Sequence, residues 1–242
     1  LVHRLSVLSK AHQLAKAANP CADPSVRDPR AKRRRASARR GATPRKQAAL
    51  TKEPLQAVLA TCDESLKGLR DRALLLFAWS TGGRRRSEVA NASWDQLRRV
   101  ADGQYLFTLG HSKTNQSGQA RPEDVKPLVG TAAQAMDAWL AASRITSGAL
   151  FRRVRKGGLI AEPLSAAAVR EIVKARCAQA GVEGEFSAHS LRSGFVTEAG
   201  KRNMPLGDTM ALTGHRSVPT VLGYFRAEGA LSSPVARLMD DE

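Results

Sequence analysis

The most restrictive feature of this sequence is a succession of helical patterns that is interrupted once, by a pair of strand-like segments. Residues 103–109 alternate as a strand does, and residues 124–129 are the expected partner strand across a polar loop. The segment Thr81-Gly82-Gly83 breaks a strongly apolar helical pattern. Helices are predicted over residues 51–61, 67–80, 84–92, 132–142, 165–180, 187–199 and 206–212. The chain is therefore predicted to be mainly α with a small antiparallel β-sheet.

The first 45 residues have a different pattern, and we expect them to form a separate region. An amphipathic helix is predicted over residues 3–18. Asp28 and Pro29 are typical of the N-cap and the first residue of a second helix, which would end at Gly41. This second helix has almost no apolar face. Residues 41–49 are typical of an exposed connector, so the boundary of the compact domain is placed at residue 46.

Positive charge dominates the composition, with 39 Lys and Arg against 22 Asp and Glu and a net charge of +17. This balance predicts a polyanionic partner, because each neutralised phosphate releases condensed counterions. A ribosomal-type basic protein would also be this basic, and the charge alone does not exclude it. For the basic run between residues 27 and 46, DNA contact is preferred to a solvated linker. The candidate DNA contacts in the second predicted helix are Lys32, Arg33, Arg34, Arg35, Arg39 and Arg40.

Three cysteines, Cys21, Cys62 and Cys177, lie far apart and show no paired spacing. This pattern disfavours a zinc site and a disulfide scaffold, and it favours a reducing cytoplasm. The longest apolar run, residues 73–79, is too short to span a bilayer. We expect a cytoplasmic protein with no bound metal ion and no membrane partner.

The residues best suited to chemistry lie beside the glycine pair and in the last third of the chain. Arg85 follows the glycine break, with Glu88 one helical turn beyond it. His189 and Arg192 are spaced so that a helix would turn both side chains the same way. Two guanidiniums can clamp the non-bridging oxygens of a phosphodiester, and an imidazole can donate or accept a proton.

His215 and Tyr224 follow in the segment LTGHRSVPTVLGYF. A tyrosine hydroxyl can attack phosphorus and leave a phosphotyrosine, which divides one difficult step into two reversible ones. This chemistry needs no cofactor, and the sequence contains no phosphate-binding P-loop motif. The other tyrosine, Tyr105, lies in the middle of a predicted strand and is expected to be a packing residue.

Four short motifs resemble the tyrosine recombinases, the phage integrase family, in their order and local spacing: Arg85-x-x-Glu88, His189-x-x-Arg192, Gly214-His215 and Tyr224. Lys113 resembles the lysine that this family carries on a loop between two strands. The resemblance covers nearly the whole chain and implies the catalytic-domain fold of the family for residues 46–242. It implies that residues 1–45 are the carboxyl-terminal part of a helical core-binding domain followed by a basic linker.

The resemblance assigns the phosphate-binding roles as follows. Arg85 and Arg192 would bind the scissile phosphate, and His215 would donate a hydrogen bond to a non-bridging oxygen. Glu88 would orient its neighbours. Arg84 and Arg86 flank Arg85, and they are candidates for DNA-backbone contacts or for solvated positions. Arg84 is also a departure, since it stands where the family has a bulky residue.

The resemblance assigns the proton-transfer roles to two further residues. Lys113 would protonate the leaving 5′-oxygen, and His189 would accept the proton of the Tyr224 nucleophile. The implied activity is site-specific recombination of double-stranded DNA through a 3′-phosphotyrosine. A type IB topoisomerase-like relaxing enzyme and a catalytically silent DNA-binding fragment are the alternatives.

Assembly on DNA is also implied. The segment after Tyr224 contains the apolar residues Val235, Leu238 and Met239, and in this family such a tail commonly packs into a neighbouring subunit. We expect a dimer to tetramer on a specific recombination site. The alanine- and arginine-rich composition favours a bacterial source, and so a protein of the bacterial cytoplasm that joins the nucleoid when it is bound to DNA.

Overall fold

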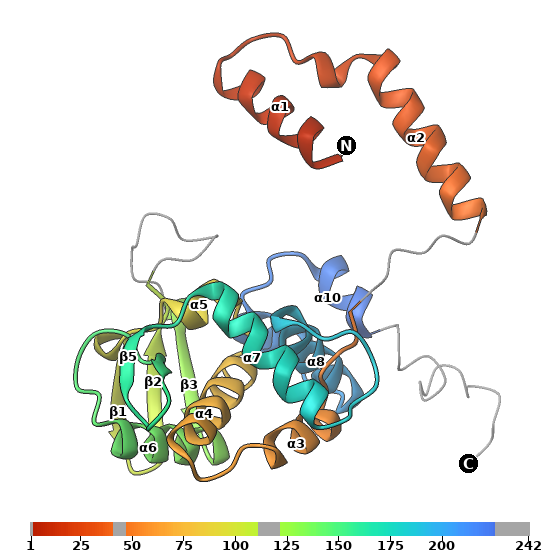
Figure 1. Ribbon diagram of the computed structural model, residues 1–242. Coiled ribbons are helices and arrows are strands. Elements are labelled where there is room, and N and C mark those ends of the chain that lie inside the picture. The colour runs from red at the N-terminus through yellow and green to blue at the C-terminus, as the bar shows by residue number, and fades with distance from the viewer. Residues whose placement is uncertain (1, 41–46, 111–121, 226–242) are drawn as a thin grey trace, which may run out of the picture. The chain divides into compact units, whose positions relative to one another are not determined.

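The computed structural model describes residues 2–40, 47–110 and 122–225. The chain divides into two compact units, Leu1–Lys46 and Gln47–Glu242 (Figure 1). No helix in the described ranges is long and apolar enough to cross a membrane. The described elements of the first unit are α1 (Val2–Leu14), the 3₁₀ helix η1 (Pro20–Ala22) and α2 (Pro24–Arg39).

The first unit confirms two predicted helices but corrects their bounds. The first helix ends at Leu14 rather than at residue 18, and Lys16 adopts a positive φ of 51°. The predicted N-cap at Asp28 is wrong, because α2 already begins at Pro24. The side chain of Asp23 accepts a hydrogen bond from the backbone N–H of Ser25 at 2.8 Å, so Asp23-Pro24 supplies the same Asp-Pro signal earlier in the chain.

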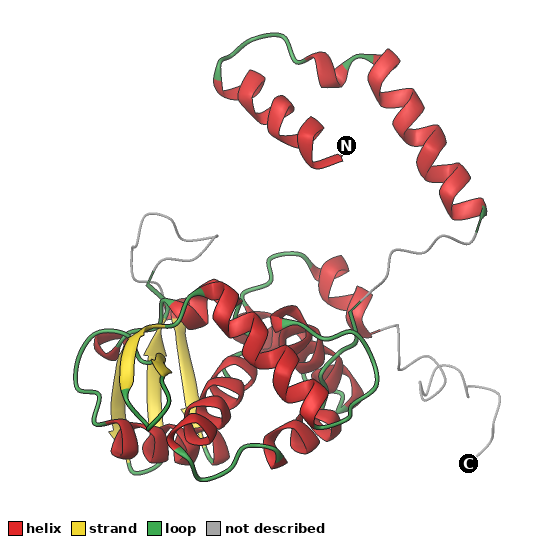
Figure 2. Cartoon of the chain, in the orientation of Figure 1, coloured by secondary structure: helices red, strands yellow, loops and turns green. Residues whose placement is uncertain are grey.

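The second unit is mainly helical with small antiparallel sheets, which confirms the predicted fold class (Figure 2). Its helices are α3 (Lys52–Ala60), α4 (Leu66–Ser80), α5 (Arg86–Ala90), η2 (Trp94–Gln96), η3 (Pro122–Asp124), α6 (Thr131–Ser143), α7 (Ala166–Gln179), α8 (Ala188–Lys201), α9 (Leu206–Thr213) and α10 (Val218–Phe225). Its strands are β1 (Leu97–Ala101), β2 (Gln104–Thr108), β3 (Val125–Val129), β4 (Arg152–Val154) and β5 (Ile160–Pro163).

The expectation of a single sheet is wrong. The described residues form a three-stranded sheet of order β1-β2-β3 and a separate β4-β5 hairpin. The predicted pair β2 and β3 is confirmed, with Tyr105 opposite Leu128. Strand β1 was not predicted, because Leu97 is its only buried residue and its sequence therefore does not alternate between apolar and polar residues. Strands β4 and β5 are short and contain no fully buried side chain.

Helix α4 forms the centre of the core and contacts both α6 and α8. Its apolar run, predicted from the sequence, is buried almost without interruption from Ala73 to Ala78. Phe77 meets the ring of Phe107 edge-on at 4.8 Å and that of Phe151 at 5.4 Å, and so joins the helix to β2 and to the residue that precedes β4. The carboxyl end of this rigid helix carries the glycine pair.

A buried ion cluster fixes the other end of α4. The carboxylate of Asp71 accepts hydrogen bonds from Nε of Arg70 at 2.9 Å and from Nε of Arg176 at 2.8 Å. Arg176 also donates to the carbonyl of Thr61, at the end of α3. Because a buried charge is costly unless it is paired, these contacts hold α3, α4 and α7 in one arrangement.

Candidate active site

The turn that follows α4 is packed directly against two later helices. Gly82 and Gly83 have φ values of +94° and +69°, a region that favours glycine. A Cβ atom on Gly82 would lie 2.4 Å from the carbonyl oxygen of Leu212, in α9. A Cβ atom on Gly83 would lie 2.2 Å from Cα of Arg192, in α8. The glycine pair therefore sets the distance between α8, which carries His189 and Arg192, and the ends of α5 and α9. Arg85 comes just before α5, and His215 comes just after α9.

Arg192 is held at the start of α8 by the backbone of this turn. Its Nη1 donates to the carbonyl of Gly83 at 3.2 Å, and the residue is 5% exposed. Burial, followed by the nearby positive charge of Arg85, lowers the pKa of Arg192. A buried guanidinium beside a second one is an environment that favours a bound anion.

Arg85 is the N-cap residue of α5 and is oriented by Glu88. Its Nη1 donates to Oε1 of Glu88 at 2.6 Å, and Oε2 of Glu88 accepts the backbone N–H of Arg85 at 3.1 Å. The Glu88 side chain is 4% exposed, whereas that of Arg85 is 38% exposed. Glu88 thus fixes one edge of the guanidinium while the side chain stays open to solvent.

Tyr224 and His189 meet across the contact between α10 and α8. The hydroxyl of Tyr224 lies 3.2 Å from Nε2 of His189. Burial lowers the pKa of His189, and Arg192 and Arg85 lower it further, so its imidazole is neutral at neutral pH. A neutral ring can accept the phenolic proton at Nε2. By contrast, Tyr105 is buried in β2 and its hydroxyl donates to Asp137, as expected of a packing residue.

His215 follows the left-handed Gly214, at the end of α9. The Thr213 hydroxyl donates to the carbonyl of Thr209 at 2.8 Å, so it accepts the hydrogen of His215 Nδ1 at 2.7 Å. This arrangement leaves the proton on Nδ1 and an acceptor at Nε2 in the neutral ring. His215 must therefore gain a second proton, or exchange its Nδ1 proton for one on Nε2, before Nε2 can donate to a phosphate oxygen.

The charges around His215 oppose that second proton. Burial lowers the pKa of His215 to about 4, and Arg192, Arg85 and Arg84 contribute to the shift in that order. The ring centre lies 6.2 Å from that of Tyr224. A phosphate bound between the arginines would offset part of the local positive charge and so favour the imidazolium.

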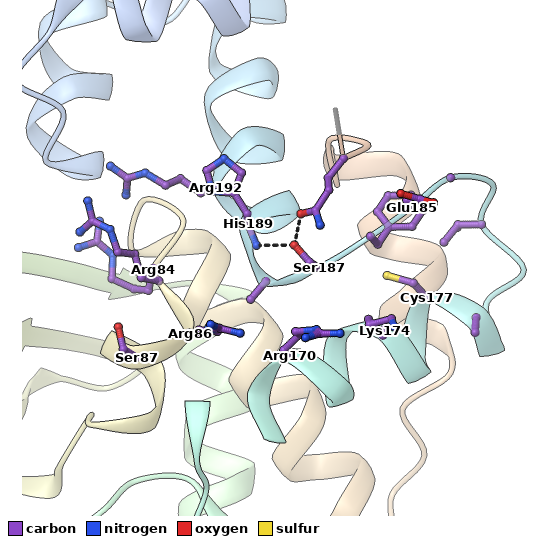
Figure 3. A pocket seen from close by; sticks show the side chains of 17 residues that line it. Arg84, Arg86, Ser87, Arg170, Lys174, Cys177, Glu185, Ser187, His189 and Arg192 are labelled. Carbon is purple, nitrogen blue, oxygen red and sulfur yellow. Dashed lines mark hydrogen bonds between the residues drawn. The ribbon is translucent and has the colours of Figure 1, made fainter. Parts of the chain in front are cut away.

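A cleft of about 850 Å³ is lined by Arg85, His189 and Arg192 (Figure 3). His189 and Arg192 lie on one side of it, and Arg86, Arg170 and Lys174 lie on the other. His215 lines a separate cleft of about 250 Å³, which shares Arg85 with the first. Arg170 and Lys174, both on α7, were not among the predicted site residues. Their spacing places them on one face of the predicted helix 165–180, a signal that the sequence offers.

The structure brings together five of the six predicted catalytic residues: Arg85, His189, Arg192, His215 and Tyr224. Arg86 is exposed, but Arg84 is 2% exposed and bonded to protein groups, which corrects the predicted DNA-backbone contact. Lys113 lies outside the described residues. In α2 and the residue after it, Lys32, Arg35, Arg39 and Arg40 are exposed, and Arg33 and Arg34 lie within the helix. Among the described residues, no group of three or more His, Cys, Asp or Glu side chains could hold a metal ion.

Residues 48–229 match the model of the phage integrase family, and the chain belongs to that family. An integrase/recombinase XerD homologue from Selenomonas ruminantium is 33% identical over 168 residues, which are 67% of this chain and 48% of that protein. Tyrosine recombinase XerC from Xylella fastidiosa (strain M23) is 29% identical over 157 residues, covering 65% of this chain and 48% of that protein. The chain thus spans about half the length of these curated relatives.

Solved structures share the fold at lower identity. The XerH site-specific recombinase bound to palindromic difH substrate has a TM-score of 0.61 at 20% identity, over 81% of this chain and 54% of that chain. A lambda integrase(75–356) dimer bound to a COC′ core site has a TM-score of 0.57 at 16% identity, over 93% of this chain and 79% of that chain. These likenesses confirm the predicted tyrosine recombinase catalytic-domain fold.

Proposed function

We propose that this chain is a site-specific recombinase that cleaves and rejoins DNA strands through a covalent bond between Tyr224 and a 3′-phosphate. The observation that carries the proposal is the 3.2 Å contact between the Tyr224 hydroxyl and Nε2 of His189, beside the buried Arg192. Membership of the phage integrase family supports it, and so do the DNA complexes among the similar structures.

In the proposed cleavage step, the Tyr224 oxygen forms a bond to phosphorus while the bond from phosphorus to the 5′-oxygen breaks. The phenolic proton passes to Nε2 of His189. Arg85 and Arg192 stabilise the negative charge on the non-bridging oxygens. Lys113 supplies the proton that the leaving 5′-oxygen takes up. Rejoining is the reverse reaction with a 5′-hydroxyl as the nucleophile, so the phosphotyrosine conserves the energy of the broken bond.

The proposal extends to the rest of the chain. Residues 1–45 are assigned to the carboxyl-terminal part of a core-binding domain, with the exposed basic residues of α2 against DNA phosphates. Assembly on a specific site as a dimer to tetramer is supported by the lambda integrase dimer on its core site. Bacterial relatives support a place in the bacterial cytoplasm, on the nucleoid when the protein is bound to DNA.

Trapping of the covalent intermediate tests the proposal. The full chain is incubated with a pool of nicked duplexes whose central sequence is randomised, and adducts that survive detergent are isolated and sequenced. We expect the unmodified protein and Tyr105→Phe to form the adduct and Tyr224→Phe to form none, because Tyr105 lies in β2 and its hydroxyl bonds to Asp137. Mass spectrometry of the nuclease-treated adduct should place the nucleotide on Tyr224.

Three results would each overturn the assignment. An adduct formed equally well by Tyr224→Phe would remove the nucleophile. Retention of DNA in gels without any adduct would identify a catalytically silent binding fragment. Relaxation of supercoiled plasmids of any sequence by the monomer would identify an enzyme of the type IB topoisomerase kind.

A further inference from the structure

Lys126 is a buried cation next to the candidate active site. Strand β3 alternates between exposed and buried residues, and this alternation turns Lys126 inward, where it is 2% exposed. Burial of an ammonium group without partners is very unfavourable. The hydrogen bonds of Lys126 therefore indicate which part of the fold its charge stabilises. Its Nζ donates to the carbonyl of Ala211 at 2.6 Å and to that of Glu123 at 2.5 Å.

Arg84 reaches the neighbouring carbonyl of the same helix. Its Nη2 donates to the oxygen of Leu212 at 2.8 Å, and its Nη1 lies 3.7 Å from Oε2 of Glu88. Ala211 and Leu212 belong to the last turn of α9, where carbonyls have no partner within the helix. The carboxyl end of a helix also carries partial negative charge, which favours cations there. Two buried cations from distant parts of the chain therefore cap one helix end.

This helix end determines where His215 lies. Thr213, the last residue of α9, holds Nδ1 of His215 at 2.7 Å, and Gly214 turns the chain between them. The contact of Thr213 with Thr209 exists only while the last turn of α9 keeps its helical form. Loosening of the carbonyls at residues 211 and 212 would thus release the imidazole.

We propose that Arg84 and Lys126 are positioning residues, a pair of buried cations that fixes the end of α9 and thereby holds His215 in the phosphate site. The inference rests on the proposed function of that site, because a fixed His215 matters only if a phosphate binds there. The inference also gives a reason for the arginine at position 84. Arg84 caps the carbonyl of Leu212, and Lys126 caps the adjacent carbonyl of Ala211 in the same way.

The charge of Lys126 gives the proposal a pH signature. Burial lowers the pKa of Lys126 to about 8, and Arg84 lowers it further, whereas Asp124, Glu123 and Glu88 oppose the shift. The element that it caps, α9, contributes carbonyl oxygens at this contact. As the pH rises through about 8, Lys126 loses its charge and the cap weakens, while Arg84 stays protonated because its pKa is about 10.

Anion binding tests the positioning role of Lys126 without any DNA cleavage. Inorganic sulfate keeps a constant charge across the range tested, and its affinity is followed by NMR of the His215 ring in the full chain at pH 7 and pH 9. Lys126→Met should weaken sulfate binding at pH 7 by about fivefold, the usual effect of one lost hydrogen bond. It should also move the pKa of His215 from about 4 toward its ordinary value. Lys67→Met is the matched control. Lys67 is exposed at the amino end of α4, about 20 Å along the helix from the carboxyl end that leads to the glycine pair.

A second variant, Lys126→Arg, tests the positioning role even if Lys126→Met does not fold. This variant should bind sulfate at pH 7 as the unmodified protein does, but it should lose the weakening between pH 7 and pH 9. Identical pH dependence in the two proteins, or a Lys126→Met protein with unchanged His215 titration and sulfate affinity, would overturn the positioning role. Either result leaves the trapping experiment on Tyr224 unaffected, so the two proposals fail separately.

Discussion

The hydroxyl oxygen of Tyr224 lies 3.2 Å from Nε2 of His189, and the two side chains come from helices α10 and α8, which pack together. Burial and the neighbouring arginines lower the pKa of His189 and keep its imidazole neutral, so Nε2 offers a lone pair to the phenol. The rate of strand cleavage should therefore depend on the ionisation of this one ring.

Cleavage should slow in acid because protonated His189 cannot accept the phenolic proton. The pKa of His189 is lowered from 6.5, so the rate should stay constant from pH 8 to below pH 6.5 and fall only as the pH drops through the lowered value. His189→Gln should reduce the rate at pH 7 by about 10² to 10⁴. Single-turnover adduct formation on a duplex selected in the trapping experiment, measured from pH 8 downward, checks both the pH dependence and the effect of His189→Gln. A variant that keeps the full rate would exclude His189 as the base.

Alanine at position 83 should disrupt the site. Its Cβ would lie 2.2 Å from Cα of Arg192, and φ is +69°, so α8 must move. Gly103→Ala is the matched control, because Gly103 has a φ of +64° with nothing within 4 Å of the added atom. We expect the control to lose about 1 kcal/mol of unfolding free energy from backbone strain, and Gly83→Ala to lose about 2 kcal/mol more. Urea denaturation measures both, and equal losses would contradict the close packing of the turn.

Neutralisation of Glu88 should destabilise the fold and loosen Arg85. Glu88 is the buried partner of Arg85 at 2.6 Å and of Arg84 at 3.7 Å, and its loss leaves the buried Arg84 without this carboxylate. Glu88→Gln should lower the free energy of unfolding by about 3 kcal/mol. Glu64→Gln, which breaks an exposed contact with Arg72, should cost less than about 1 kcal/mol. If both variants unfold at the same urea concentration, Glu88 has no such role.

The sequence alone predicted the parts of the fold that have strong local signals. The apolar run of α4 and the helix predicted from residue 165, observed as α7, are examples, since each depends on residues close together in the chain. Strand β1 was missed because it buries one side chain, and α10 because its eight residues are few and include Pro219 and Gly223, which disfavour a helix. A helix of that length is stabilised by its contact with α8, which no local pattern reveals.

The candidate site shows the same division. The spacing of His189 and Arg192 indicated their shared direction, because both lie on the first turns of one helix. The burial of Arg84 could not be predicted, since it depends on the carbonyl of Leu212, far along the chain. Lys126 was likewise hidden in a strand pattern, where a lysine normally marks the solvent face. The acceptors here are backbone carbonyls, which every residue has. The residue types at positions 211 and 212 therefore do not reveal these long-range contacts.

Stability in acid should report the environment of His215. Its pKa is about 4 in the folded protein and near 6.5 in an unfolded chain, so below pH 6.5 the unfolded state binds a proton that the folded state does not. The free energy of unfolding should therefore fall as the pH drops from 6.5 to 4, by about 1 to 2 kcal/mol from this half-buried ring once solvent screening is included.

Carboxylates also titrate in this range, so the quantity to compare is the difference between the unmodified protein and His215→Gln in urea denaturation at each pH. That difference should decline steadily toward pH 4, and a constant difference would show that the ring is not held in its positive surroundings. Sulfate should oppose the decline, because an anion between Arg85 and Arg192 stabilises the imidazolium. The same anion would place a proton on Nε2 of His215, which is the form able to donate to a phosphate oxygen.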